Sequence, residues 1–163
     1  RKLALEPLIH GGESTTIYRS GTPTVALAAS LETALEAAVG ELPARTARVK
    51  EANAFLRDAL SKYPKVHINS PENAIPHILN LSVENVKGTV FQRELDAEGV
   101  CVSVKSACSS DGLPSRAVFA VSRDRRNALS SWRISLSHLT TEAEIQEFLQ
   151  VFDVCCQQLT AAR

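Results

Sequence analysis

The chain has 163 residues, of which 44% are hydrophobic, and its 18 basic residues are balanced by 18 acidic ones. This length and apolar content suit one globular domain or a large fragment of a bigger protein. A net charge of zero argues against a nucleic-acid-binding surface, and no apolar run approaches membrane-spanning length, so neither partner is expected.

The four cysteines are Cys101, Cys108, Cys155 and Cys156, and none of them forms a Cys-x-x-Cys pair. This spacing disfavours both a disulfide scaffold and a zinc site. The first residues also lack the charged-then-apolar pattern of a secretory signal. We therefore expect reduced thiols, no bound metal and a cytoplasmic location.

The first 23 residues show no helical or strand period after Ile9, because glycine and proline interrupt the pattern repeatedly. Polar clusters occupy His10–Glu13 and Arg19–Thr22. A glycine-rich loop placed before a helix can bind an anion through backbone N–H groups. The alternative is a surface loop whose glycines only supply turn geometry, and the residues by themselves favour that alternative.

Two helices are predicted next. Leu27, Leu31 and Leu35 recur at helical spacing, and Gly40 suits the end of that helix. Leu42-Pro43 then opens a second helix with its own apolar stripe, formed by Val49, Ala52, Leu56 and Leu60.

Four short strands are predicted from period-2 alternation, at residues 66–68, 78–83, 100–104 and 131–137. In the second strand, Asn80 and Ser82 lie on the face opposite the leucines, and we expect a structural role for Asn80. In the last strand, Trp132 and Ile134 point inward, so Arg133 lies on the other face.

The later helices carry recognisable ends. Thr89 and Gln92 form a plausible capping box for a helix that Gly99 terminates. A short helix is expected around residues 118–121, followed by a charged connection at residues 123–127.

A second capping box, Thr141 with Glu144, predicts the start of the last helix. The stripe of this helix places Cys155 and Cys156 in or near the core. Helices segregated around a small, mainly antiparallel sheet make an α+β domain.

Cys108 follows the 100–104 segment in a run of small polar residues that ends at Gly112. Structural cysteines usually lie within apolar runs, whereas reactive ones occupy exposed and locally positive surroundings. Lys105 either favours the thiolate or is solvated without a catalytic effect. Taken alone, a loop cysteine is more often inert than catalytic.

Three groups of segments share their order and approximate spacing with one known family: Pro7–Gly12 with Arg19–Pro23, Ile78–Ser82 with Val102–Ser103 and Ser106–Ser110, and Ser130–Leu136 with Leu139–Ile145. Together they resemble the C-terminal part of the cysteine desulfurases that depend on pyridoxal 5'-phosphate (PLP), the NifS/IscS-like branch of the class V aminotransferases. The resemblance spans nearly the whole chain. It implies the small C-terminal domain of a PLP enzyme of fold type I.

The resemblance also implies roles for four residues. Cys108 falls on the family's nucleophile, whose thiolate attacks the sulfur of PLP-bound L-cysteine and leaves alanine and an enzyme persulfide. Arg133 falls on the arginine that binds the substrate carboxylate, with a surface salt bridge as the alternative. Thr22 falls on the threonine that reaches the cofactor phosphate of the other subunit in a homodimer. His10 lies in the loop that delivers that threonine.

The resemblance divides the chain into residues 1–23, a loop reaching toward the partner subunit's active site, and residues 24–163, the small domain. The family's Schiff-base lysine, its cofactor-stacking histidine and the acid that pairs with the pyridine nitrogen all precede the matched region. We therefore expect the PLP-binding large domain to be absent from this chain, and the chain by itself to be inactive.

The expected function is the C-terminal part of a cysteine desulfurase that passes sulfur to an acceptor or scaffold protein for iron–sulfur cluster or thio-cofactor synthesis. One alternative is a relative with the same fold that acts on another amino acid, such as a selenocysteine lyase or an aminotransferase-like enzyme. The other alternative is a stand-alone domain that binds a partner without catalysis.

Overall fold

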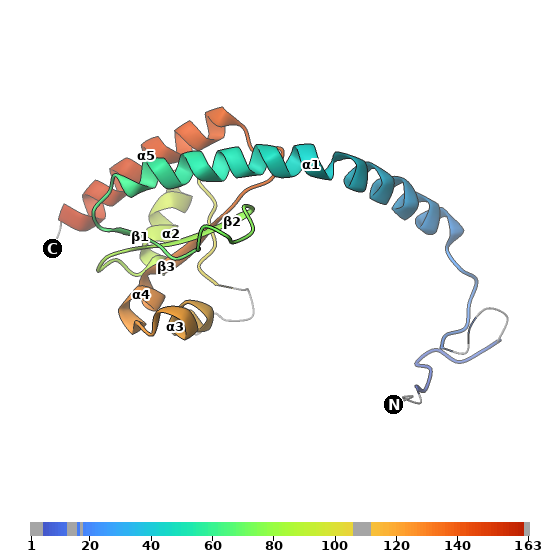
Figure 1. Cartoon of the computed structure of the whole chain (residues 1–163). Coiled ribbons are helices and arrows are strands. Elements are labelled where there is room, and N and C mark those ends of the chain that lie inside the picture. The colour runs from blue at the N-terminus through green and yellow to red at the C-terminus, as the bar shows by residue number, and fades with distance from the viewer. Residues whose placement is uncertain (1–4, 13–15, 17, 106–111, 162–163) are drawn as a thin grey trace. The chain divides into compact units, whose positions relative to one another are not determined.

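The computed structural model describes residues 5–12, 16, 18–105 and 112–161, which form five helices and three strands in the described part of the chain. In chain order the elements are α1 (Val25–Ser61), β1 (Val66–Ile68), β2 (Ile78–Val83), α2 (Gly88–Ala97), α3 (Arg116–Ser122), α4 (Arg125–Ser130), β3 (Ser131–Ser135) and α5 (Glu142–Ala161), as Figure 1 shows. Internal contacts divide the chain into two units, residues 1–42 and 43–163, with the boundary inside α1. Within the described ranges, no helix combines the length and the apolar character that crossing a bilayer requires.

The second unit is built on an antiparallel sheet with the strand order β1-β2-β3. The register sets Leu81 of β2 opposite Trp132 of β3, and Asn80 opposite Arg133. This sheet with its helices confirms the predicted α+β class. The predicted bounds of β1 and β2 are confirmed, and β3 ends at Ser135, two residues earlier than predicted.

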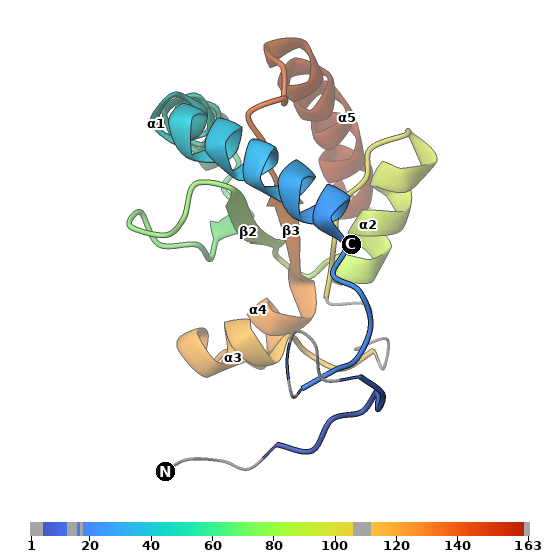
Figure 2. The ribbon, with the colours of Figure 1, turned by 90° about the vertical axis from the view of Figure 1, so that its right-hand side faces the viewer.

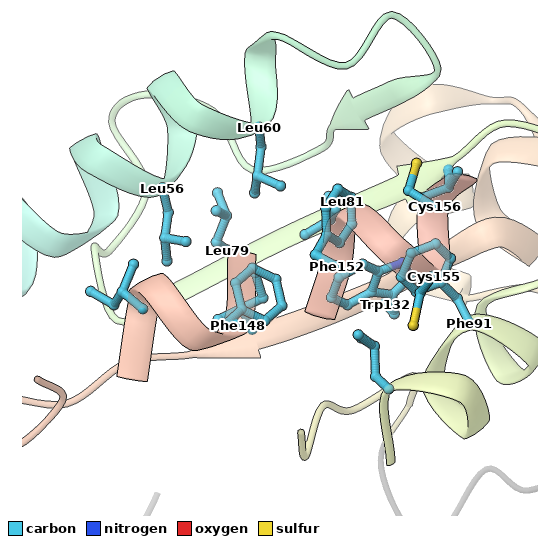
Figure 3. Close-up of a cluster of buried hydrophobic side chains, with 14 of the residues drawn as sticks. Leu56, Leu60, Leu79, Leu81, Phe91, Trp132, Phe148, Phe152, Cys155 and Cys156 are labelled. Atoms are coloured by element: carbon cyan, nitrogen blue, oxygen red, sulfur yellow. The ribbon is translucent and has the colours of Figure 1, made fainter. Parts of the chain in front are cut away.

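One face of the sheet is the hydrophobic core, because alternate residues of β2 and β3 point into it. Figure 3 shows this cluster, in which side chains from α1 and α5 meet those of the sheet. Trp132 is fully buried and stacks on Phe91 of α2, with 5.2 Å between ring centroids. Phe152 of α5 lies 5.3 Å from the Phe91 ring. The core thus fixes which residues of each strand remain for the opposite face.

The start of α5 confirms the second capping box. The Glu144 N–H donates to Thr141 Oγ1 at 3.2 Å, and the Thr141 N–H donates to the Glu144 carboxylate at 2.7 Å. The Thr141 N–H and the Thr141 hydroxyl both donate to the Glu144 carboxylate, and these two bonds lower the pKa of Glu144. Further along α5, Cys155 and Cys156 are buried free thiols, as predicted.

The predicted break between two helices is wrong, because α1 runs without interruption through Gly40 and Pro43. A proline inside a helix has no N–H, so one hydrogen bond of the helix is missing. Its fixed φ is nevertheless compatible with helical backbone. The segment around Pro43 is exposed, so water can satisfy the Val39 carbonyl that Pro43 leaves unpaired. Before this point, the predicted stripe of Leu27, Leu31 and Leu35 is exposed in the first unit.

The predicted capping box of α2 is also wrong. Lys87 occupies the N-cap position without a side-chain capping bond, and Gln92 instead donates from Nε2 to the Val102 carbonyl at 2.9 Å. A long-range acceptor therefore replaces the local one. At the other end, Gly99 follows α2 with φ +81°, which confirms the predicted terminus.

Two further predictions are corrected on the far side of the sheet. The predicted strand at residues 100–104 is a single antiparallel bridge between Ser103 and Arg133, because only Ser103 reaches β3 with both backbone groups. The predicted connection at residues 123–127 contains the start of α4. Asp124 caps this helix by accepting from the N–H groups of Arg126 and Asn127.

Candidate functional site

The face of the sheet opposite the core carries polar side chains and borders a cavity. Figures 1 and 2 show α5 on one side of the strands and α3 and α4 on the other. A cavity of about 480 Å³ lies on the α3 side and is lined by Asn69, Asn80, Lys105, Arg116 and Arg133, among others. Side-chain alternation in β2 and β3 thus supplies polar groups to the cavity while their neighbours fill the core.

Arg133 is held in this cavity by its backbone. Its N–H donates to the Ser103 carbonyl at 2.7 Å, and its carbonyl accepts from the Ser103 N–H at 3.1 Å. Its side chain is half-buried, and its Nε is buried without a hydrogen-bond partner among the described residues. Buried donors in native proteins are nearly always paired with an acceptor. The unpaired Nε–H of Arg133 is therefore available to donate a hydrogen bond to a ligand.

The charged residues in the described lining of the cavity have one sign. Of the described residues that line it, three are cationic, namely Lys105, Arg116 and Arg133, and none is acidic. A cavity lined by one sign of charge concentrates ligands of the opposite sign. The arrangement is therefore suited to an anionic group, and the planar fork of Arg133 matches a carboxylate or a phosphate.

Cys108 lies outside the described residues, and its predicted role stays a prediction. The chain on either side of residues 106–111 is described. Lys105 and Leu113 both line the cavity that contains Arg133. The covalent chain therefore leaves and rejoins the described part of the molecule at the edge of this cavity.

His10 and Thr22 belong to the first unit, whose described loop brings two segments side by side. Ile9 and Arg19 form a parallel bridge, and the Ser20 hydroxyl donates to the His10 carbonyl at 2.9 Å. A Cβ on Gly11 would meet Ser20 at 2.8 Å, so the approach of the segments requires glycine there. The His10 side chain itself is exposed.

The end of this loop has the chemistry of a phosphate site. Thr22 is exposed, and its hydroxyl has no hydrogen-bond partner among the described residues of the loop. Gly21 precedes it at φ +104°, and an Arg19 guanidinium nitrogen lies 3.3 Å from where a Cβ on Gly21 would be. A hydroxyl donor and a guanidinium at an exposed turn fit the phosphate of PLP.

Sequence reasoning did not find the hydrogen-bonded amides beside Arg133. Asn80 was expected to be structural, and Asn69 was not singled out, yet both line the cavity. The only local signal was the position of Asn80 on the polar face of its strand. The position of Asn80 opposite Arg133 depends on the register of β2 with β3, and alternation within each strand predicts only the face on which each residue lies.

Comparison with known proteins gives the family. A model of the class-V aminotransferase family matches residues 8–148. The chain belongs to this family. It is 34% identical over 158 residues to a cysteine desulfurase IscS from Dictyoglomus turgidum, covering 95% of this chain and 40% of that protein. It is 32% identical over 159 residues to an IscS-like cysteine desulfurase from Mycobacterium tuberculosis, covering 93% and 39%.

Solved structures of the family agree with these sequence matches. A NifS-like protein superposes with a TM-score of 0.75 and 30% identity, covering 93% of this chain and 39% of its own. A NifS-like protein from Rickettsia africae also has a TM-score of 0.75, with 27% identity and coverage of 94% and 40%. The chain thus spans about 40% of the length of each of these class-V relatives.

Proposed function

We propose that this chain is the C-terminal part of a PLP-dependent cysteine desulfurase, with Arg133 binding the carboxylate of L-cysteine. The observation that carries the proposal is the cationic cavity in which the buried Arg133 Nε lacks an acceptor among the described residues. A carboxylate supplies that acceptor. The relatives named cysteine desulfurases support cysteine as the substrate.

In this proposal, the Cys108 thiolate accepts the substrate sulfur. A sulfur–sulfur bond forms as the carbon–sulfur bond of L-cysteine breaks. The electron pair of the broken bond stays with carbon, which takes up a proton and leaves as alanine. Three residues of extended chain span at most about 11 Å, so the tether from Lys105 keeps the thiol within reach of the cavity.

Other thiols in the described chain are poor candidates for this role. Burial raises the pKa of Cys155 and of Cys156, with nearby carboxylates adding to the effect, so both favour the neutral thiol. Both also belong to the core cluster (Figure 3) and do not line the cavity that contains Arg133. Cys101 is exposed but borders a different cavity, on the side of α5.

The cofactor of the family is PLP, which when bound withdraws electron density from the α-carbon of an amino acid. In the proposed homodimer, Thr22 holds the cofactor phosphate of the partner subunit. His10 helps to shape the loop that presents Thr22, through the bond between its carbonyl and Ser20. The exposed hydroxyl of Thr22 and the nearby Arg19 support this assignment.

The fate of the sulfur belongs to the same proposal. A persulfide on Cys108 is passed to an acceptor or scaffold protein for iron–sulfur cluster or thio-cofactor synthesis. We place this reaction in the cytoplasm, where free thiols such as Cys101, Cys155 and Cys156 remain reduced.

The test uses protein expressed from the complete gene, supplied with PLP and L-cysteine. We expect alanine release, together with one added sulfur atom on the peptide that contains Cys108. Cys108→Ser removes the nucleophile, so both products fall to background. Cys101→Ser is the matched control, because it removes an exposed thiol seven residues earlier and keeps both products.

Alanine release that persists in Cys108→Ser would contradict the sulfur-transfer role. Turnover of selenocysteine in place of cysteine would assign the site to a selenocysteine lyase. If neither amino acid yields alanine, the enzyme proposal fails and binding of a partner becomes the alternative.

A further inference from the structure

Asn80 lies directly beside Arg133 on the polar face of the sheet. The two residues are paired across β2 and β3, so their side chains project from the same face. Both line the cationic cavity. We propose that Asn80 is a second binding residue for the substrate carboxylate, held for that purpose by Asn69; this inference rests on the proposed role of Arg133.

A hydrogen-bond network determines which end of the Asn80 amide faces the cavity. The Ser82 hydroxyl donates to the Asn127 carbonyl at 3.1 Å, so its oxygen remains free to accept. Asn69 Nδ2 donates to that oxygen at 2.8 Å and also to Asn80 Oδ1 at 2.9 Å. Asn127 Nδ2 donates to Asn69 Oδ1 at 2.8 Å, which occupies the other end of the Asn69 amide. In this arrangement, Asn127 Oδ1 is buried without a hydrogen-bond partner among the described residues.

The consequence is that Asn80 presents donors to a ligand. Its Oδ1 is turned toward Asn69, so its Nδ2 is turned away from Asn69. This Nδ2 has no hydrogen-bond partner among the described residues, and the side chain is half-buried. An amide N–H₂ beside an unpartnered guanidinium N–H forms a pair of donors that matches the two oxygens of a carboxylate.

The backbone of Asn80 is fixed as well. Its N–H donates to Ser70 Oγ at 2.9 Å, and its carbonyl accepts from the Asn69 N–H at 2.8 Å. The loop after β1 thus clamps both the main chain and the amide of Asn80. Because these groups are already ordered, little conformational entropy remains to be lost when a ligand binds.

Asparagine also fits this position better than an acid would. Asparagine accepts from Asn69 with one end of its amide and donates with the other. Aspartate could still accept from Asn69, but its second oxygen would face the ligand and would pair with Arg133. Asn80→Asp therefore preserves the shape and the bond to Asn69 while replacing a donor by an acceptor. A purely structural Asn80 would tolerate this change.

The experiment uses the complete protein with PLP and compares L-cysteine with cysteamine, the same amine and thiol without the carboxylate. We expect Asn80→Asp to raise the KM for L-cysteine by about ten- to a hundredfold, because a charge-assisted hydrogen bond is lost and a repulsion is added. Cysteamine is used as a competitive inhibitor of L-cysteine turnover. Because it has no carboxylate, its inhibition constant should be the same in the variant and the wild type. Asn73→Asp is the control, because it adds the same charge on the exposed turn of the loop that follows Asn69.

A second variant tests Asn69 as a positioning residue. Asn69→Asp places an acceptor opposite Asn80 Oδ1, so the Asn80 amide turns over and presents its oxygen to the cavity. We expect the same selective rise in the KM for L-cysteine. This variant leaves Asn80 in place, so it also decides the question if Asn80→Asp does not fold.

Arg133→Gln separates this inference from the proposed function. A selective loss of L-cysteine binding in Arg133→Gln, with none in Asn80→Asp and Asn69→Asp, overturns the role of Asn80 and leaves the role of Arg133 intact. No selective loss in Arg133→Gln removes the proposed carboxylate site itself. Equal weakening of L-cysteine and cysteamine in the asparagine variants makes Asn80 structural.

Discussion

At the scale of single residues, Gly88 shows how the core constrains the sheet. It is the first residue of α2, and a Cβ at this position would overlap the carbonyl oxygen of Ser131. Ser131 is fully buried, paired with Ser82 across the sheet, and donates its hydroxyl to the Ala128 carbonyl at 3.0 Å. The backbone that an added methyl group would meet is therefore held from two sides.

Gly88→Ala is expected to destabilise the protein by about 1–3 kcal/mol, the usual cost of overpacking a close contact. The better helix propensity of alanine offsets only part of this cost. Urea unfolding of the wild type and the variant measures the difference. An unchanged urea midpoint would show that the backbone of β3 at Ser131 shifts to accommodate the added methyl group at little cost.

At the scale of elements, α1 shows that local signals do not always end a helix. Gly40 and Pro43 were expected to separate two helices, yet they lie in the interior of one. Glycine and proline each disfavour a helix. The rest of this long helix is rich in alanine, leucine and glutamate, whose high helix propensity offsets that free-energy cost. The boundary between the two units also falls in this segment, between Leu42 and Pro43.

Gly40→Ala provides a matched comparison with Gly88→Ala. A Cβ on Gly40 would meet nothing within 4 Å, and the residue lies inside the helix. The substitution should therefore stabilise α1 by about 1 kcal/mol, since alanine loses less backbone entropy than glycine on folding. The urea midpoint of unfolding should therefore rise in Gly40→Ala and fall in Gly88→Ala, each relative to the wild type. A loss of stability in Gly40→Ala would indicate a contact with a part of the protein outside the described residues.

At the scale of the whole molecule, three groups in or against α5 destabilise the fold when they ionise. They are the phenol of Tyr63 and the thiols of Cys155 and Cys156. Burial raises the pKa of Tyr63, and the hydrogen bond to Asp153 at 3.0 Å adds to the effect. Burial likewise raises the pKa values of Cys155 and Cys156. The folded state keeps these groups neutral at a pH where the unfolded chain has lost their protons. Their stabilising contribution is complete below the unfolded pKa values and is lost as the pH rises through the folded ones.

Stability is therefore expected to fall as the pH rises above about 9, first through the thiols and then, above about 10, through Tyr63. Tyr63→Phe should flatten the decline above pH 10, whereas Tyr18→Phe, which changes an exposed phenol, should not. Thermal unfolding between pH 8 and 11 measures both variants. A decline that is the same in Tyr63→Phe and wild type would assign the alkaline instability to other groups.

The whole molecule also shows which features a sequence can predict. The strands β1, β2 and β3 follow from alternation among neighbours, and the α5 cap follows from residues three apart, because these signals act locally. Gln92 escaped prediction because its acceptor, the Val102 carbonyl, is ten residues away. The amides of Asn69 and Asn127 are 58 residues apart and meet only after the sheet has formed. The proposed role of Arg133 comes from the family resemblance, whereas the position of Asn80 opposite Arg133 required the register of β2 with β3.

The bridge between Ser103 and Arg133 has a mechanical consequence. Two backbone hydrogen bonds join the root of the Cys108 segment to the strand that carries the proposed substrate-binding arginine. A displacement of β3 is therefore expected to move Ser103 together with Arg133. Under the proposed function, the length of chain between Ser103 and Cys108 limits how far the thiol can lie from Ser103. Under the proposed function, inserting or deleting one residue between Lys105 and Cys108 should change the rate of sulfur transfer. It should leave the binding of the substrate carboxylate by Arg133 unchanged.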